Sequence, residues 1–317
     1  MNSYIIKRML AAVPVMIGIS LLSYSLLYIS PGDPAEILLR LQLGTVNPDA
    51  AAVEAFRAEH GLNDPIYIQY GNWLGNVLKG DMGRSFRTGR PVIEEFFARF
   101  PLTFQLVLIA EILALLIAVP LGIVSSSMHN SVVDHILRFF ALIGVSMPSF
   151  WLGLLLIFFI SLHLRLIPVL SYGSSMSLVL PITTLCIGSA ASIMRLTRAS
   201  MLEVLRQNYI RTARAKGVNE VQVIWHHAFR NALIPVITIF GIHLGHLAGG
   251  TVIVETIFSW PGVGRFLVDS IYARDFPVIQ GFVFLISLIF LLISLSIDIA
   301  YSVFDPRIRY DVPKLER

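Results

Sequence analysis

The sequence predicts an all-α membrane protein with six membrane-spanning helices. The 317-residue chain is 56% hydrophobic, has a mean hydropathy of +0.74, and only 14% of its residues are charged. A typical soluble domain carries about a quarter charged residues. Six stretches also have the roughly 20 apolar residues that a helix needs to cross the hydrocarbon core. Because the bilayer offers the backbone no water to bond, these stretches should be helices.

The six predicted spans cover, in order, about 9–29, 102–124, 139–162, 178–199, 232–256 and 279–303. Lys7 and Arg8 before the first span resemble the start of a signal peptide. Its apolar run is long, however, and ends in "SPGDPAE" without a small-residue cleavage pattern, so we expect an uncleaved helix. The resulting segments are the first helix at 1–30, an extracytoplasmic loop at 31–100, a transmembrane core of five helices at 101–304 with a cytoplasmic loop at 200–231, and a tail at 305–317.

The distribution of Lys and Arg predicts that both termini are cytoplasmic. Basic residues gather at the N-terminus, in the tail and in the segment 195–230, which has seven Lys or Arg against two Glu, a net charge of +5. With six spans these three regions share one side, and cytoplasmic loops are the ones enriched in Lys and Arg. The overall excess of +4 is too small and too uneven to indicate a nucleic-acid partner.

Two helices are predicted in the loop after the first span. The stretch "NPDAAAVEAFRAEHG" begins with Asn47 as N-cap and Pro48 in the first position, and it ends at Gly61. In "IYIQYGNWLGNVLKG", helical spacing places these residues on one face: Ile66, Tyr70, Trp73, Leu74, Val77 and Leu78. A helix with Trp and Tyr on its apolar side either lies at the membrane interface or forms a cap packed against the spans.

The basic segment 195–230 has the pattern of two short helices around a glycine. The stretch "MRLTRASMLEVLRQNYIRTARAKG" predicts a helix that ends at Gly217, and Asn219 is a possible N-cap of the next. Apolar Val223, Ile224 and Ala228 suggest a packed face. A loop that only sets topology or touches anionic lipid needs no defined shape. This pattern fixes a shape, and a shaped basic knob suits docking to another protein.

Charged and imidazole side chains at membrane depth are costly and are therefore candidates for a transport path. They are Glu111, His243, His246, Glu255 and Asp298. For Glu111 the alternative is a hydrogen bond between helices, and for Asp298 it is pairing with an arginine near the cytoplasmic boundary. Glu255 either lines the outer mouth or pairs with Arg265 or Arg274.

The histidines fall into two groups. His243 and His246 are three residues apart in "GIHLGHLAGG", so both imidazoles share one helix face. Imidazole suits Ni and Zn, which makes the pair a candidate metal site, with interhelical hydrogen bonding as the alternative. The adjacent His226 and His227 point to different sides of a helix and are assigned to the cytoplasmic loop. Cys186 is the one cysteine, so no disulfide or cysteine metal cluster can form within the chain.

The stretch "RTARAKG" followed by "HHAFRNALIP" resembles the cytoplasmic signature loop of ABC importer permeases. That loop usually reads E-A-A, three residues and then Gly. Here Arg211, Thr212 and Ala213 stand in place of E-A-A, and Gly217 matches. The departure at Arg211 and Thr212 is typical of the dipeptide/oligopeptide/nickel permease family. Further matching pieces follow in one order along nearly the whole chain: "SPGDPAE", "GLNDPIYIQYGNWL", "GDMGRSF", "GVSMPSFW", "VETIFSWPGVGR", "RDFPVIQG" and "DPRIRY".

This resemblance implies a type I ABC importer permease in a bacterial inner membrane, with six helices, an extracytoplasmic helical insert after the first, and alternating access. The loop would be a coupling helix that enters a groove on a separate ATPase subunit. Its docking surface would comprise Arg211, Thr212, Ala213, Arg214, Lys216 and Gly217. The implied partners are a second, related permease, two ATPase subunits, an extracytoplasmic binding protein and membrane lipid, but no nucleic acid. The ATPase subunits would bind ATP and Mg, because this chain has no G-x-x-x-x-G-K-[ST] phosphate-binding loop.

For the substrate, "GIHLGHLAGGTVIVETIFSWPGVGR" resembles the nickel-permease branch. His243 matches a histidine of that branch, whereas His246 stands where the branch has an acidic residue. We therefore predict import of nickel or a metal chelate, with His243 and His246 as metal ligands and with di- or oligopeptide import as the alternative. A stand-alone secondary transporter would show internal repeats, which this chain lacks. The enzyme motifs H-E-x-x-H and G-x-S-x-G are also absent.

Overall fold

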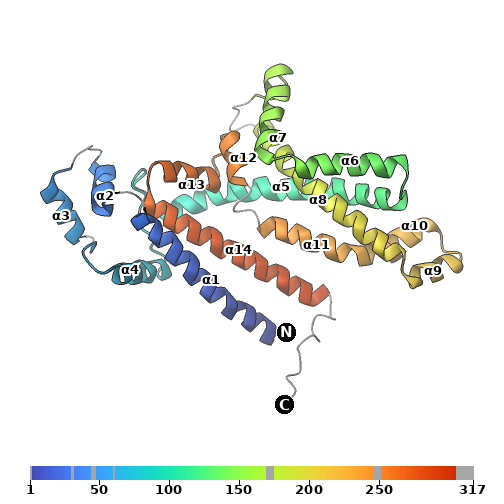
Figure 1. Cartoon of the computed structure of the whole chain (residues 1–317), viewed down its shortest axis with the longest axis horizontal. Coiled ribbons are helices and arrows are strands. Elements are labelled where there is room, and N and C mark those ends of the chain that lie inside the picture. Colours follow the sequence, from blue (N-terminus) through green and yellow to red (C-terminus); the bar gives the residue numbers. More distant parts are fainter. Residues whose placement is uncertain are drawn as a thin grey trace, which may run out of the picture. The chain divides into compact units, whose positions relative to one another are not determined.

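The computed structural model of this chain describes residues 2–29, 32–43, 48–59, 61–168, 175–245 and 251–304. Apart from an isolated bridge between Arg84 and Pro91, the secondary structure of these residues is helical (Figure 1). The all-α prediction is therefore confirmed. The chain forms two compact units. The first unit contains Thr103–Trp260 and the chain from Ile293, and the second contains Asn2–Leu102 and Pro261–Leu292.

Two long helices, α5 (Val92–Ser127) and α14 (Phe276–Phe304), contribute residues to both units. The remaining helices of the first unit are α6 (Val132–Ser146), α7 (Ser149–Leu156), the π-helix η1 (Ile157–His163), η2 (Ser175–Leu178), α8 (Val179–Leu205), α9 (Asn208–Ala215), α10 (Glu220–Gln222), the π-helix η3 (Val223–Ala228), α11 (Phe229–Gly245) and α12 (Thr251–Ile257). Those of the second unit are α1 (Asn2–Ile29), α2 (Pro34–Leu43), α3 (Ala50–Glu59), α4 (Ile66–Leu78) and α13 (Val263–Tyr272).

The described chain has five helices long and apolar enough to cross a membrane, or six when the bent pair of α6 with α7 and η1 counts as one span. The five are Arg8–Ile29, Val92–Ser127, Met176–Leu205, Glu220–Gly245 and Phe276–Ile297. This agrees with the predicted count of six only if the bent pair is a single span. The fifth predicted span, 232–256, corresponds to α11 up to Gly245 and α12 from Thr251, and the stretch 246–250 between them lies outside the described residues.

The third predicted span, a single helix at 139–162, is wrong in shape. Val132–Ser146 and Ser149–His163 meet at an angle of 103°. The break lies at Met147 and Pro148. Proline has no N–H for a helical bond and disfavours the helical conformation of the residue before it. Met147 accordingly has φ −82° and ψ 119°, an extended backbone.

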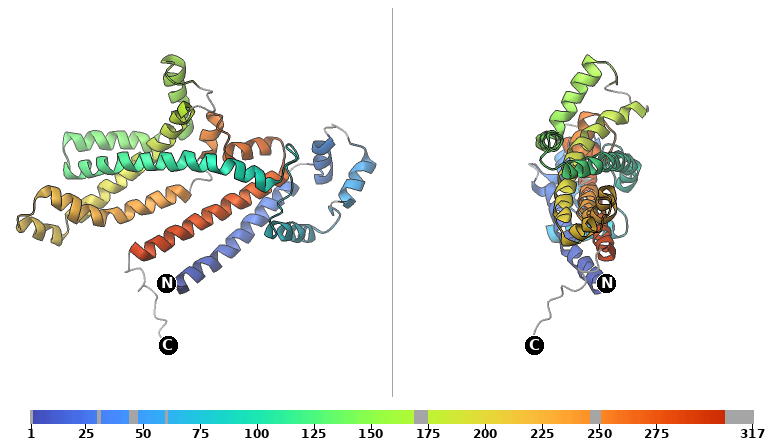
Figure 2. Two further views of the ribbon diagram at one scale, coloured as in Figure 1. Left: turned by 180° about the vertical axis from the view of Figure 1, so that it is seen from behind. Right: turned by 90° about the vertical axis from the view of Figure 1, so that its right-hand side faces the viewer.

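Small residues allow the helices of the first unit to pack closely against α8. A Cβ added to Gly122 of α5 would lie 2.7 Å from the Cβ of Thr197, and one added to Gly144 of α6 would lie 2.8 Å from the Cβ of Ala191. Glycine and alanine at such positions let helix backbones approach each other. Helix α8 packs against α6 and runs obliquely to both α5 and α6 (Figures 1 and 2).

In the second unit, the predicted helix at 66–78 is confirmed as α4, and part of its apolar face packs inward. The Tyr24 ring of α1 lies 5.7 Å from that of Tyr70 and 5.5 Å from that of Trp73, centroid to centroid. Two members of the predicted face, Ile66 and Leu78, point outward and are 49% and 77% exposed. The buried face continues instead through Gln69. The side-chain amide of Gln69 donates to the backbone carbonyls of Leu62 and Asp64, and its oxygen accepts from the Tyr24 hydroxyl. Burying this amide therefore costs little.

A buried polar contact that the sequence did not indicate joins two further segments of the second unit. Asp275 is 1% exposed and accepts hydrogen bonds from the Ser85 hydroxyl (2.6 Å) and the Phe86 amide (3.1 Å). The two stretches "GDMGRSF" and "RDFPVIQG" therefore meet in space. The helix predicted to end at Gly61 is α3, and Gly61 has the expected positive φ of 63°. Asn47, its predicted N-cap, lies outside the described residues.

Candidate coupling loop and membrane-embedded polar site

The basic segment folds as a knob beyond the ends of α8 and α11 (Figures 1 and 2). The predicted continuous helix up to Gly217 is wrong, because α8 ends at Leu205 and Gln207 has an extended backbone (φ −69°, ψ 150°) before α9 begins. The predicted stop at Gly217 is confirmed by its φ of 78°. Its amide donates to the carbonyl of Arg214 at 2.9 Å. A left-handed residue after the last helical turn is the usual way to cap a helix.

The second helix of the knob begins as predicted. The Asn219 side chain accepts a hydrogen bond from the Val221 amide at 3.1 Å and so caps α10. The chain then continues through the π-helical η3 into α11. Of the predicted packed face, Val223 and Ala228 are fully buried and Ile224 is half-buried.

A buried apolar cluster anchors the inner face of α9. Ile210 and Ala213 of α9 are 0% and 9% exposed. The other buried members are Ile123 of α5, Met201 of α8, Val223 and Ala228 of η3, and Ala232 of α11. These residues come from four neighbouring elements, so α9 is packed against α5, α8, η3 and α11.

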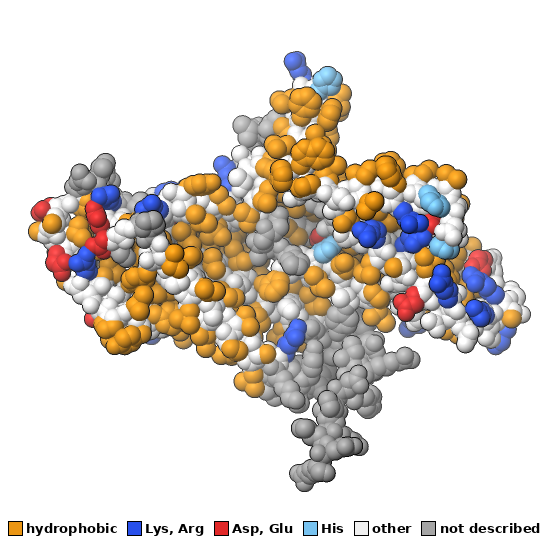
Figure 3. Space-filling view, viewed as in Figure 1, with side chains coloured by type: hydrophobic (Ala, Val, Ile, Leu, Met, Phe, Trp, Pro, Cys, Tyr) orange, Lys and Arg blue, Asp and Glu red, His pale blue; other side chains and the backbone are white. Residues whose placement is uncertain are grey.

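The outer face of α9 is basic and open to solvent. Arg211, Thr212 and Lys216 are exposed, whereas Ala213 belongs to the buried cluster. Arg214 reaches across the glycine turn to Glu220, with its Nε and Nη2 donating at 3.0 and 2.5 Å. These hydrogen bonds and the attached charge raise the pKa of Arg214 above its usual value. Figure 3 shows Lys and Arg side chains gathered over the knob.

A polar site inside the first unit joins three helices. Glu111 of α5 is 5% exposed, and its Oε1 accepts a hydrogen bond from the Ser189 hydroxyl of α8 at 2.5 Å. Its Oε2 lies 3.4 Å from Nδ1 of His243 on α11. Two of the predicted path residues are therefore in contact, and Glu111 also makes the interhelical bond considered as its alternative role. Ser189 was not predicted.

The other candidates in the membrane lie apart from this contact or outside the described residues. Glu255 of α12 is fully buried and accepts a hydrogen bond from the Thr103 hydroxyl at 2.6 Å, a partner that the sequence did not indicate. His246 and the side chain of Asp298 lie outside the described residues. Within the described ranges, no group of three or more His, Cys, Asp or Glu side chains could hold a metal ion.

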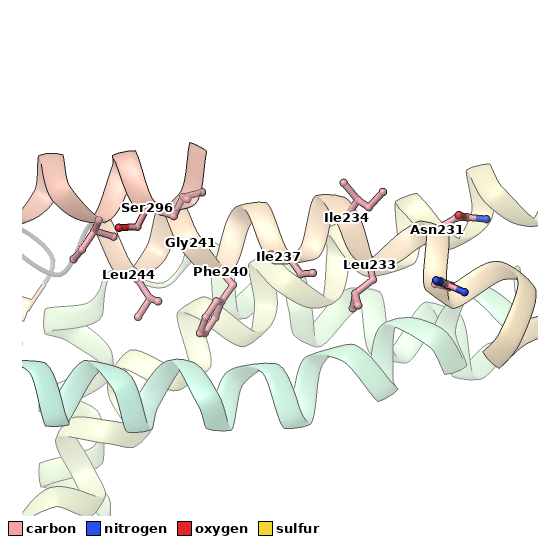
Figure 4. Close-up of a pocket in the computed structure, with 11 residues that line it drawn as sticks. Asn231, Leu233, Ile234, Ile237, Phe240, Gly241, Leu244 and Ser296 are labelled. Carbon is pink, nitrogen blue, oxygen red and sulfur yellow. The ribbon is translucent and has the colours of Figure 1, made fainter. Parts of the chain in front are cut away.

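An apolar groove runs along α11 beside the end of α14 (Figure 4). Its volume is about 610 Å³. Its apolar walls include Ile234, Ile237, Phe240, Leu244 and Ile297. The polar residues Arg230 and Asn231 line one end of the groove. This wall suits a hydrophobic helix or the apolar side chains of a substrate, and no motif in the sequence pointed to it.

A buried ion pair at the start of α6 was also missed. Asp134 is fully buried and accepts hydrogen bonds from Nε and Nη2 of Arg198 on α8 at 2.7 and 2.8 Å. It also accepts from the Ser125 hydroxyl at 2.6 Å and the Asn130 amide at 3.0 Å. The sequence held a signal for the start of α6 but not for the ion pair, because Ser131 caps the helix and an acid three residues later is typical of a helix start.

Comparison with known families decides what this arrangement belongs to. A family described as "Binding-protein-dependent transport system inner membrane component" matches residues 118–310, and its N-terminal companion matches residues 1–107. The chain belongs to this family of ABC importer permeases.

Individual relatives match the permease over almost its whole length. The oligopeptide transport system permease protein AppB of Bacillus subtilis is 41% identical, and the match covers 98% of this chain and 100% of AppB. The dipeptide transport system permease protein DppB of Alkalihalophilus pseudofirmus is 39% identical, and the glutathione transport system permease protein GsiC of Escherichia coli is 40% identical. Both have the same coverage of 98% and 100%.

Solved structures support the fold of the permease. An inward-facing form of the MetNI methionine ABC transporter matches with a TM-score of 0.55 at 19% identity, over 66% of this chain and 95% of that chain. An amino acid ABC transporter crystallised with histidines matches with a TM-score of 0.50 at 20% identity, over 68% and 94%. The family match makes the permease a multi-pass inner-membrane component of an ABC importer. These relatives are named for oligopeptide, dipeptide and glutathione transport, and none of the three names mentions the predicted nickel.

Proposed function

We propose that this permease forms half of the translocation pathway of an ATP-driven peptide importer and couples to a separate ATPase through α9. The observation that carries the coupling is the construction of the knob. Its inner face is fixed by the buried cluster around Ile210, while the outer face leaves Arg211 and Lys216 exposed. A rigid helix joined to three spans can transmit closure of an ATPase as rigid-body rocking.

The substrate is proposed from the relatives and from the membrane-embedded site. Relatives at 39–41% identity over 98% of the chain are named for oligopeptide, dipeptide and glutathione transport. The metal-binding prediction has weaker support. Among the described residues, Glu111 is the one candidate metal ligand in contact with His243, and no group of three candidate ligands is present. The ammonium group of a peptide can pair with a carboxylate such as that of Glu111. Its apolar side chains suit the groove along α11.

The proposed assembly of the complete transporter is that of the ABC importer family. A second permease supplies the other half of the pathway, two ATPase subunits bind ATP and Mg, and an extracytoplasmic binding protein delivers the peptide. Both termini and α9 are cytoplasmic in this arrangement. Of the remaining path candidates, Glu255 suits a structural role best because it is fully buried and bonded to Thr103, whereas His246 and Asp298 stay predictions.

The test is uptake by the complete transporter in proteoliposomes. Labelled dipeptide, labelled glutathione and labelled nickel are offered in turn, with the binding protein present and with ATP inside or omitted. We expect ATP-dependent uptake of a peptide and none of nickel. Nickel uptake without peptide uptake would overturn the substrate. Uptake by this chain alone, driven by an ion gradient, would overturn the coupling to an ATPase.

A further inference from the structure

Two arginines on the surface of the first unit lack a partner among the described residues. Arg138 of α6 and Arg195 of α8 are both exposed, and the described contacts give neither a hydrogen bond nor an ion pair. The acid at this place, Asp134, is fully buried and already bonded to Arg198. A positive charge therefore remains unbalanced beside α6.

These arginines line a cavity of about 490 Å³ between α6 and α8. Its walls are His135, Arg138, Phe139, Leu142, Arg195 and Arg198. The cavity has a mixed character, because Phe139 and Leu142 are 60% and 56% exposed next to the cationic groups. Figure 3 shows Arg and His side chains gathered beside α6 and bordered by hydrophobic surface.

The helix lengths indicate the depth at which this cavity would lie in a bilayer. The span Met176–Leu205 has 30 residues and is about 45 Å long, against a hydrocarbon core of roughly 30 Å. One end of it therefore extends into the headgroup region. Arg195 is about 15 Å from Leu205 along α8, and Arg138 is about 9 Å from the start of α6. The contact of Asp134 with Arg198 places the start of α6 level with this part of α8.

We propose that this cavity binds one anionic phospholipid, with its phosphate between Arg138 and Arg195 and an acyl chain along Phe139 and Leu142. Guanidinium groups donate paired hydrogen bonds to phosphate oxygens. The apolar rim distinguishes this ligand from free phosphate, which has no group to place there. The bound lipid covers the junction of α6 and α8 next to the ion pair that joins them.

Native mass spectrometry of the complete, delipidated transporter tests the proposal. Phosphatidylglycerol and phosphatidylcholine with the same acyl chains are added in equal amounts. We expect one phosphatidylglycerol to be retained per copy of this chain in preference to phosphatidylcholine. Arg138→Gln and Arg195→Gln should each weaken its binding by about fivefold, and the double variant by roughly 25-fold. Arg206→Gln, which removes another exposed arginine outside the cavity, should change the binding less than twofold.

Three outcomes would overturn the proposal. Equal losses in all three single variants would mean general attraction to a basic surface instead of a site. Displacement of phosphatidylglycerol by millimolar inorganic phosphate would assign the cavity to the free anion. Loss of the ATPase subunits from Arg138→Gln and Arg195→Gln, with lipid retention unchanged, would make the cavity a protein contact. The same spectra report subunit composition, so they also show that each variant has assembled.

Discussion

Removing Asp134 tests how the first unit is held together. The substitution Asp134→Ala leaves Arg198, whose side chain is 16% exposed, without its counter-charge in a largely buried place. It also removes the acceptor for the Ser125 hydroxyl and the Asn130 amide. Breaking a buried ion pair by removing one partner costs about 3–5 kcal/mol. We expect the denaturation midpoint of the purified permease to fall by roughly 6–20 °C, at 2–4 °C for each kcal/mol.

The double variant Asp134→Ala/Arg198→Met separates the ion pair from a general loss of packing. Because no charge is then left buried, we expect the double variant to lose about 2 kcal/mol less stability than the sum of the losses in Asp134→Ala and Arg198→Met alone. Arg206→Ala, an exposed arginine at the end of the same helix, is the control and should shift stability by less than about 0.5 kcal/mol. Additive single effects, or an Asp134→Ala variant as stable as the parent, would refute the reasoning.

Three further changes test separate contacts. Gly217→Ala should destabilise the knob by about 1 kcal/mol, since φ is 78° while no atom lies within 4 Å of the new Cβ; thermal denaturation measures this, and a larger loss would mean a hidden clash. Gly122→Ala should cost about 1–3 kcal/mol by the same assay, because the new Cβ would lie 2.7 Å from the Cβ of Thr197. Its control Gly188→Ala meets nothing within 4 Å and should be neutral or stabilising. Glu111→Gln retains an oxygen for Ser189 and so assembles normally, but should lower peptide uptake by roughly tenfold; unchanged uptake would remove this carboxylate from the path.

Most of the fold could be predicted because hydrophobic length is a strong signal. Runs of apolar residues, which are costly to expose to water, located the spans, although α5 begins at Val92, before the predicted start at 102, and α8 ends at Leu205, beyond the predicted end at 199. The 103° bend at Pro148 was not predicted, because a proline in an apolar run is compatible with either a kink or a break. Packing against neighbouring helices decides between them, and that information lies in distant residues such as Ile257 and Phe258, which face Gly153 of α7.

The candidate site was predictable where one short segment contains all of its chemistry. Gly217 and Asn219 cap adjacent helices, so local sequence was enough to place them. The pair of Asp134 and Arg198 lies 64 residues apart in the chain, and Glu111 lies 132 residues from His243. No spacing rule connects such residues, because the contact depends on how three helices pack.

The binding of the ATPase subunits to α9 is the most direct test of the account. The variant Arg211→Glu/Lys216→Glu reverses two exposed charges of the outer face and leaves the buried cluster and the Arg214–Glu220 pair intact. Affinity of the purified ATPase for the permease pair is measured by surface-immobilised titration, with Arg206→Glu as the control outside α9. We predict that affinity falls by roughly tenfold or more, a loss of at least about 1.4 kcal/mol, while the second permease stays bound. Unchanged ATPase affinity in this variant would contradict the coupling role of α9.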